Sequence, residues 1–196
     1  MVGGAGIAAI YESRPAPLVL EKGESLERST AIVGVVRGTA QGELAELSVE
    51  LKPGKGRVLL SVPPYEDRDT QGSAVDAVEA AERLTGFDLS GVDVVFSIEA
   101  DADLIAGPSA GAAMAMLVVA AIENLEVRRD AVVSALVEPD GGLKPAGFLD
   151  IKLRAARDAG FKLFIVAREH KELEAPAGIE VVEVGTLKEL CETLLF

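Results

Sequence analysis

Two side chains in this sequence, a serine and a lysine, are suited by type and position to covalent chemistry. Ser109 stands within Gly-Pro-Ser-Ala-Gly at residues 107–111, where a helix is predicted to begin. Lys152 lies forty-three positions further on, on the apolar face of a second predicted helix. A serine hydroxyl becomes a nucleophile when a nearby base takes its proton, and an uncharged lysine amine can be that base. The pair therefore suggests acyl transfer at Ser109.

The neighbours of Ser109 predict a helix N-terminus that could stabilise negative charge. Pro108 is typical of the first helical position, and small residues follow it. The backbone N–H groups of Ser109, Ala110 and Gly111 would then point out of the helix end, toward the oxyanion of a tetrahedral intermediate. The alternative interpretation is that Ser109 is an ordinary cap on a buried helix. The short motif alone leaves both open.

Lys152 is predicted to share a helical face with Leu149, Leu153 and Ala156. A lysine on such a face must pair with another group, extend its amine to the surface or lose its proton. Desolvation lowers the pKa of a lysine, to roughly 5–6 in documented buried cases. The pattern alone therefore leaves two interpretations, a general base or a lysine that reaches solvent at the helix edge.

Other schemes for catalysis find fewer suitable residues. The single histidine, His170, lies in a charged stretch at residues 168–172 that we interpret as solvated, so a Ser-His hydrolase would depend on that one residue. The single cysteine, Cys191, excludes an internal disulfide and a cysteine-based metal cluster, and we interpret it as a core residue. Asp101 and Asp103 lack the spacing of an EF-hand, and no phosphate- or dinucleotide-binding motif is recognisable. We expect no metal and no cofactor.

The composition describes an acidic chain with enough apolar residues for one large domain. Its 196 residues carry a formal net charge of −13, which disfavours nucleic acid and anionic lipid as partners. The apolar run at residues 110–122 is shorter than the roughly 18 residues expected of a membrane span, and predicts a buried core helix. We expect a cytoplasmic protein, and leave open a membrane anchor or signal in a longer natural chain.

The pattern of apolar residues predicts strands in the first half and alternating strands and helices in the second. Residues 1–28, with a short strand candidate at 18–21, are interpreted as an arm or edge element, and residues 29–196 as one domain. The first three strands of that domain are predicted to form an antiparallel meander. The predicted strands are 31–37, 43–51, 57–62, 92–98, 131–137, 162–167 and 179–184, and the predicted helices begin at 70 and 109 and span 149–159 and 187–195.

Taken together, these motifs resemble the proteolytic domain of Lon proteases, over about residues 32–195. Residues 107–111 resemble the nucleophile motif of the family, and residues 145–152 resemble the loop and helix that carry its catalytic lysine. The resemblance implies that Ser109 is the nucleophile and Lys152 the catalytic lysine. It also implies that Ser134 takes the place of a threonine whose hydroxyl helps to hold the lysine. Two departures are Ala106, where many members have aspartate, and Phe148, where the family has glycine.

The resemblance implies an α+β fold of the Lon proteolytic-domain type, with mixed sheets and helices packed on them. It implies a serine endopeptidase that cleaves unfolded proteins or peptides, without an ATPase in this sequence and similar to archaeal ATP-independent members. A ring-shaped homo-oligomer, with a hexamer as the expected form, is implied in the same way, and a separate ATPase or membrane anchor is left open. The alternative is a catalytically silent interaction or assembly module with the same fold.

Overall fold

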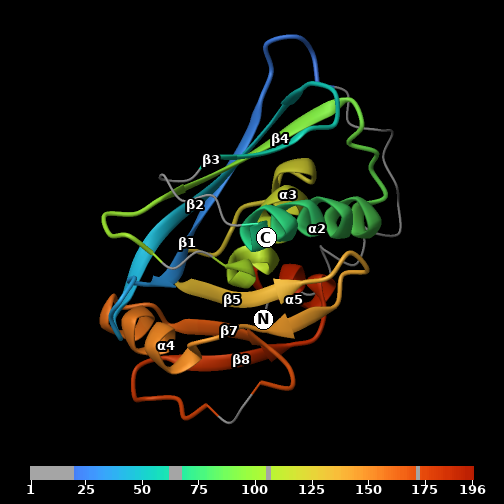
Figure 1. Cartoon of the computed structure of the whole chain (residues 1–196). Coiled ribbons are helices and arrows are strands. Elements are labelled where there is room, and N and C mark those ends of the chain that lie inside the picture. Colours follow the sequence, from blue (N-terminus) through green and yellow to red (C-terminus); the bar gives the residue numbers. More distant parts are fainter. Residues whose placement is uncertain (1–19, 62–67, 105–106, 171–172) are drawn as a thin grey trace.

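The computed structural model describes residues 20–61, 68–104, 107–170 and 173–196. Its strands form two four-stranded sheets, and helices pack between and beside them (Figure 1). The first half of the chain supplies one sheet, and the second half supplies the other. The predicted α+β architecture with mixed sheets is confirmed.

The first sheet has the strand order β1-β2-β4-β3. β1 pairs antiparallel with β2, β2 pairs antiparallel with β4, and β3 lies parallel to β4. The predicted meander is therefore wrong in its third strand, because β4 lies between β2 and β3. The chain reaches β4 from β3 through helix α2, and such a crossover joins parallel neighbours. The bounds are β1 (Leu26–Val35), β2 (Gly42–Pro53), β3 (Val58–Ser61), β4 (Val92–Glu99) and α2 (Arg68–Thr85).

The second sheet has the strand order β6-β5-β7-β8. β5 and β6 are antiparallel, whereas β5, β7 and β8 are parallel neighbours. β5 has the predicted bounds, but the three-residue β6 was not predicted, because so short a segment has no periodicity. The bounds are β5 (Ala131–Val137), β6 (Leu143–Pro145), β7 (Leu163–Ala167) and β8 (Glu180–Val184), with helix α4 (Leu149–Asp158) between β6 and β7 and helix α5 (Leu187–Leu194) after β8.

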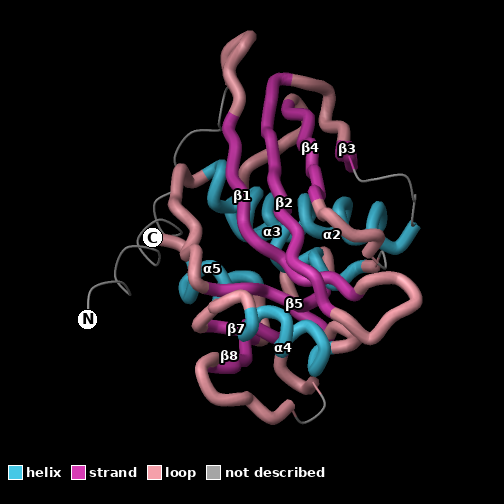
Figure 2. Tube along the Cα trace, turned by 90° about the vertical axis from the view of Figure 1, so that its left-hand side faces the viewer, coloured by secondary structure: helices cyan, strands magenta, loops and turns pink. Residues whose placement is uncertain are grey.

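Helix α3 (Gly111–Ile122) forms the centre of the molecule. All of its residues are buried, and α2 lies beside it under the long strands of the first sheet (Figures 1 and 2). It follows directly on the 3₁₀ turn η1 (Pro108–Ala110), so the turn that contains the predicted nucleophile leads straight into the core. Within the described residues, no helix combines the length and apolarity of a membrane span.

Buried apolar residues form two clusters. The larger surrounds α3 and includes residues of the first sheet, α2, β5 and α5. The smaller lies around α4, and we call it the α4 cluster. Its buried members are Val33, Val132, Leu149, Leu153, Ala156, Phe164, Val166 and Ile179.

The N-terminal part of the chain is described only from Leu20 onward. In the strand candidate at 18–21, residues 18 and 19 lie outside the described residues, and Leu20 and Glu21 are not in a strand. β1 begins at Leu26, five residues before the predicted strand, so the proposed boundary at residue 28 falls within β1. The arm itself stays a prediction.

Candidate active site

Ser109 lies in the middle of η1, between the end of the first sheet and the buried helix α3. Pro108 occupies the first turn, where a missing N–H costs nothing, and the preceding Gly107 has extended backbone angles. Small residues follow because the turn packs closely on α2. A Cβ added at Gly111 would lie 2.3 Å from Ser73 Oγ. The sequence thus anchors Ser109 to the core while leaving its own side chain partly exposed.

Lys152 lies in the second turn of α4 and points into the protein. It is only 4% exposed, and Leu149, Leu153 and Ala156 are buried on the same helical face. The alternative of a lysine that extends its amine to solvent is therefore wrong. The helix begins after Phe148, which has a left-handed backbone (φ 59°) and whose carbonyl oxygen accepts the Lys152 N–H at 3.1 Å.

The buried amine of Lys152 meets two hydroxyl groups from different elements. Its Nζ lies 2.7 Å from Ser109 Oγ and 3.2 Å from Ser134 Oγ. Ser134 is in β5 and is 1% exposed, so its hydroxyl is held by the centre of the second sheet. The structure therefore brings together the three side chains that the sequence singled out.

Burial lowers the pKa of the Lys152 amine from 10.5 to about 8. The cause is desolvation, which penalises the charged form of the amine. Among the described residues, no carboxylate forms an ion pair with this amine, and both its hydrogen-bond partners are hydroxyl oxygens. Near neutral pH a useful fraction of the amine is uncharged, so it can accept a proton from Ser109.

The two other backbone groups proposed for an oxyanion site differ in their surroundings. The N–H of Gly111 donates to Pro108 O within η1, so it already has a partner. Ala110 is the last residue of η1 and the N-cap of α3, and it is 9% exposed. The N–H of Ser109 lies at the open start of the turn, where helical N–H groups lack carbonyl partners. This geometry favours Ser109, more than Gly111, as an oxyanion donor.

His170 lies apart from this group of side chains. Its side chain is 7% exposed, which corrects the interpretation that it is solvated, and its Nε2 lies 3.0 Å from Oε1 of Glu183 in β8. The charged neighbours of His170 suggested exposure, but the side chain is largely buried and contacts Glu183 of β8. At the Ser109 hydroxyl, the nitrogen base in contact is Lys152.

Two hydroxyl-bearing residues near the site were not singled out from the sequence. Gly107 N–H donates to Thr70 Oγ1 at 3.0 Å, and Ser73 Oγ donates to Pro108 O at 3.2 Å. Both residues lie in the first turns of α2 and are buried. The sequence does contain a sign of their role. Thr70 and Ser73 are polar residues three positions apart on a helical face that is otherwise mostly alanine.

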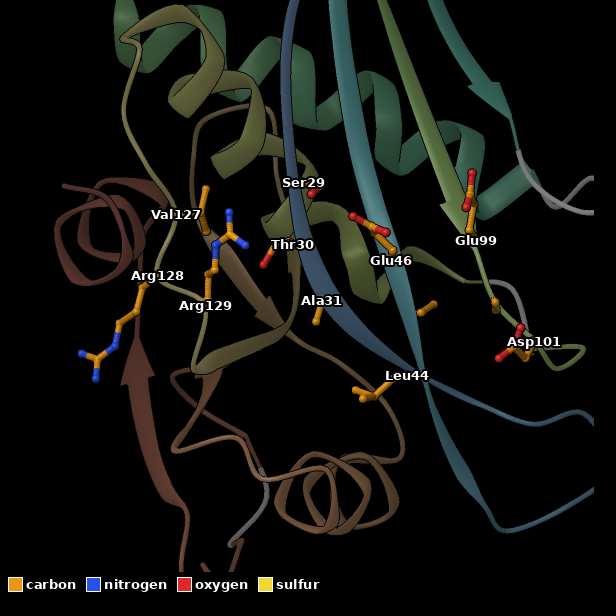
Figure 3. Close-up of a pocket in the computed structure, with 12 residues that line it drawn as sticks. Ser29, Thr30, Ala31, Leu44, Glu46, Glu99, Asp101, Val127, Arg128 and Arg129 are labelled. Carbon is orange, nitrogen blue, oxygen red and sulfur yellow. The ribbon is translucent and has the colours of Figure 1, made fainter.

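A hollow of about 670 Å³ lies along β1, bounded by β2, β4 and the segment 127–129 (Figure 3). Figure 3 shows Arg128 and Arg129 on one side of β1, and Glu46, Glu99 and Asp101 on the other. Ser109, Ser134 and Lys152 are not among the residues that line it. The reactive groups are therefore distinct from this hollow.

Comparison with known proteins places the chain in a family. Residues 20–195 match the family model of the Lon protease (S16) C-terminal proteolytic domain. The chain is similar to an archaeal Lon protease of Archaeoglobus fulgidus, with 26% identity over 84% of this chain and 27% of the relative. It is also similar to Lon protease 2 of Bacillus subtilis (26% identity, 83% of this chain, 33% of the relative) and to a Lon protease of Brucella suis (30%, 83% and 22%).

The chain thus spans a third or less of the length of these relatives. The match nevertheless covers η1, β5 and α4, the three elements that bring Ser109, Ser134 and Lys152 together. The chain belongs to the family of Lon protease C-terminal proteolytic domains.

Proposed function

We propose that this domain is a serine endopeptidase in which Ser109 is the nucleophile and Lys152 the general base. The observation that carries the proposal is the 2.7 Å contact between the Ser109 hydroxyl and a buried amine whose pKa is lowered to about 8. A snorkelling lysine would keep its charge in water and away from the hydroxyl. A lysine held here for structure alone would need a carboxylate or several polar acceptors to offset its burial.

The reaction begins when uncharged Lys152 accepts the Ser109 proton while Oγ attacks the carbonyl carbon of the peptide bond. The tetrahedral intermediate collapses as the protonated amine gives that proton to the leaving nitrogen, and the bond to that nitrogen breaks. An acyl-enzyme and a free amine result. Lys152 then takes a proton from water while the water oxygen adds to the ester carbon. As the second tetrahedral intermediate collapses, the bond from that carbon to Ser109 Oγ breaks, the protonated amine returns the proton to Oγ, and the carboxylic acid product leaves.

Ser134 keeps the amine pointed at the nucleophile. Its hydroxyl lies 3.2 Å from Nζ and is fixed in the buried centre of β5, so it orients the lysine without adding charge. A hydroxyl can donate to the amine when it is neutral and accept from it when it is protonated. Ser134 therefore stays bonded through both halves of the proton transfer.

The oxyanion is stabilised by backbone N–H groups at the start of η1, with Ser109 as the first donor and Ala110 as a second candidate. Such donors act where charge develops in the transition state, and each is worth roughly 3–4 kcal/mol. The N-terminal end of the turn and of α3 adds a favourable dipole.

The proposed substrates are unfolded proteins and peptides, the substrate class implied by the resemblance to Lon proteolytic domains. The proposal includes cleavage without nucleotide and a ring-shaped homo-oligomer. Mass measurement by light scattering tests the assembly separately from the chemistry.

The experiment compares the cleavage of casein and a fluorogenic peptide by the wild type, Ser109→Ala and Lys152→Ala, with and without ATP. Lys144→Ala is the matched control, because Lys144 is an exposed lysine in β6. We expect both dyad variants to lose cleavage and Lys144→Ala to retain it. Full activity of Lys152→Ala would refute the dyad. A wild type that neither cleaves nor reacts with a serine-directed acylating probe would favour the silent module.

A further inference from the structure

We propose that Ser73 and Thr70 of α2 are positioning residues that fix the backbone of the nucleophile turn, and with it the direction of the Ser109 N–H. This inference rests on the proposed function and deepens it. It assigns a catalytic purpose to the beginning of α2, an element that supplies no atom to the Ser109–Lys152 pair.

Three hydrogen bonds connect the beginning of α2 to the two residues that precede Ser109. The Thr70 hydroxyl accepts from Gly107 N–H at 3.0 Å and donates to Gly107 O at 3.4 Å. The Ser73 hydroxyl donates to Pro108 O at 3.2 Å. A hydroxyl has both donor and acceptor capacity, so Thr70 can hold Gly107 from both sides.

The bond from Ser73 acts on the Ser109 N–H through the peptide plane. The Pro108 carbonyl and the Ser109 N–H belong to one planar trans peptide group, so they point in opposite directions. Ser73 Oγ holds the carbonyl on the α2 side, and Gly111 N–H bonds the same oxygen from within the turn. The Ser109 N–H is therefore directed away from α2, and a rotation of this peptide would break both bonds.

The packing around these hydroxyls leaves little freedom for alternatives. Ser73 is 4% exposed and Thr70 is 5% exposed. A Cβ on Gly111 would come within 2.3 Å of Ser73 Oγ, so α2 and the turn are already in close contact. Loss of either hydroxyl removes a directional contact from a buried site without changing the charge of the Ser109–Lys152 pair.

The expected consequence is a loss in the chemical step rather than in substrate binding. Preorganised donors stabilise the transition state only when they point at the position of the oxyanion, and small misplacements are costly. We expect Ser73→Ala and Thr70→Val each to lower kcat about 10-fold, with KM changed less than about 2-fold, because the loss concerns the transition state. Thr70→Ser keeps the hydroxyl and should retain most of the wild-type kcat.

The test measures kcat, KM and the midpoint of thermal unfolding for these variants on one fluorogenic peptide. Thr85→Val is the matched control, because Thr85 is a buried threonine at the other end of α2 whose hydroxyl donates to Ala81 O at 2.8 Å. It should lose comparable stability and keep kcat. Active-site titration of each variant corrects for any unfolded fraction.

The inference is overturned if Ser73→Ala and Thr70→Val keep the kcat of Thr85→Val, since the hydroxyls would then serve stability alone. It is also overturned if Thr70→Ser loses as much kcat as Thr70→Val. If Thr70→Val does not fold, Ser73→Ala and Thr70→Ser still decide the question. Wild-type and Ser109→Ala enzymes in the same assay show separately whether cleavage depends on Ser109, and without that dependence both proposals fail.

Discussion

Lys152 and Asp93 are both ionisable and both nearly excluded from water, at 4% and 2% exposure, yet the protein treats them in opposite ways. Asp93, in β4, accepts N–H bonds from Lys55 and Arg57 and pairs with the Arg57 guanidinium. These partners hold the pKa of the Asp93 carboxyl well below its usual range. Among the described residues, the hydrogen-bond partners of the Lys152 amine are two neutral hydroxyls, and burial lowers the pKa of that amine.

The partners of a buried ionisable group decide which of its protonation states is stable. Partners of opposite charge and aligned N–H donors make the ionised form the stable one, so Asp93 fastens the turn between β2 and β3. A buried amine without such partners gives up its proton easily, which costs stability but yields a base.

Replacement of Lys152 by methionine should abolish activity without destabilising the fold. Removal of a general base costs about 10²–10⁴-fold in rate. Methionine fills a similar volume and needs no hydration, so the free energy of unfolding should stay the same or rise. Peptide cleavage at pH 7 measures the loss of activity, and chemical denaturation at the same pH measures the free energy of unfolding. A clear loss of stability in Lys152→Met would contradict this prediction, because it would mean that the amine stabilises the fold as the Asp93 carboxylate does.

Replacement of Asp93 by alanine should have the opposite profile, with a large loss of stability and little change in kcat for the folded fraction. The N–H groups of Lys55 and Arg57 would lose their acceptor. The depressed pKa means that the stabilisation by Asp93 is present above about pH 4, the ordinary carboxyl pKa, and is lost as the pH falls further. Thermal melts between pH 2 and pH 7 should therefore show a flatter acid slope for the variant.

Asp88→Ala is the control for that experiment. Asp88 is exposed, and its carboxylate accepts one backbone N–H, from Ser90. Equal losses of stability in Asp93→Ala and Asp88→Ala would show that burial and the additional partners of Asp93 do not contribute to stability.

The pH dependence of Lys152 should appear in both rate and stability. The uncharged fraction grows as the pH rises toward about 8, so kcat/KM should climb with pH and level off above that value. Above pH 8 the unfolded chain, with a lysine pKa of about 10.4, binds a proton that the folded chain does not, so the free energy of unfolding should rise.

The full rise in stability should be about 3 kcal/mol and should be complete near pH 10.5. Denaturation curves at intervals from pH 7 to pH 10.5 measure it, with Lys152→Met as the reference that lacks this contribution. If the two proteins have parallel stability profiles, the amine titrates as in water and the proposed base is wrong.

The smallest expected effect concerns backbone strain in the loops near Asp93 and Lys152. The turn near Asp93 has a glycine, Gly56, at φ 72°, whereas the loop before α4 has Phe148 at φ 59° with its side chain 61% exposed. Phe148→Gly and Phe148→Ala both remove the ring, but only glycine adopts this backbone without cost. We expect the glycine variant to be more stable than the alanine variant by about 1 kcal/mol in urea denaturation. A more stable alanine variant would show that the loop carries no strain.

The sequence was most informative where a pattern and a local motif agreed. β5 has its predicted bounds, Ser109 and Lys152 meet as their motifs suggested, and Ser134 lies beside them as the resemblance implied. The pairing of β3 was missed because its partner β4 comes after an intervening helix, and the alternation of a strand does not name its neighbour.

Burial by distant elements was the other source of error. His170 has charged neighbours in the sequence, but its side chain is largely buried and contacts Glu183 of β8. Thr70 and Ser73 were not singled out from the sequence, because their partners at Gly107 and Pro108 are more than thirty positions away. In each case the residue contacts a partner that is distant in the sequence, so the neighbouring residues do not indicate its burial or its role.

The two residues of the proposed dyad lie on elements that pack in different apolar clusters. Ser109 precedes α3 at the centre of the larger one, while Lys152 is carried by the α4 cluster, which has far fewer buried members. Native proteins open locally in cooperative units whose opening free energies differ, and a unit with few buried apolar contacts opens at lower cost. Mild denaturant should therefore silence cleavage before the global unfolding transition, as α4 detaches its amine from an otherwise intact protein.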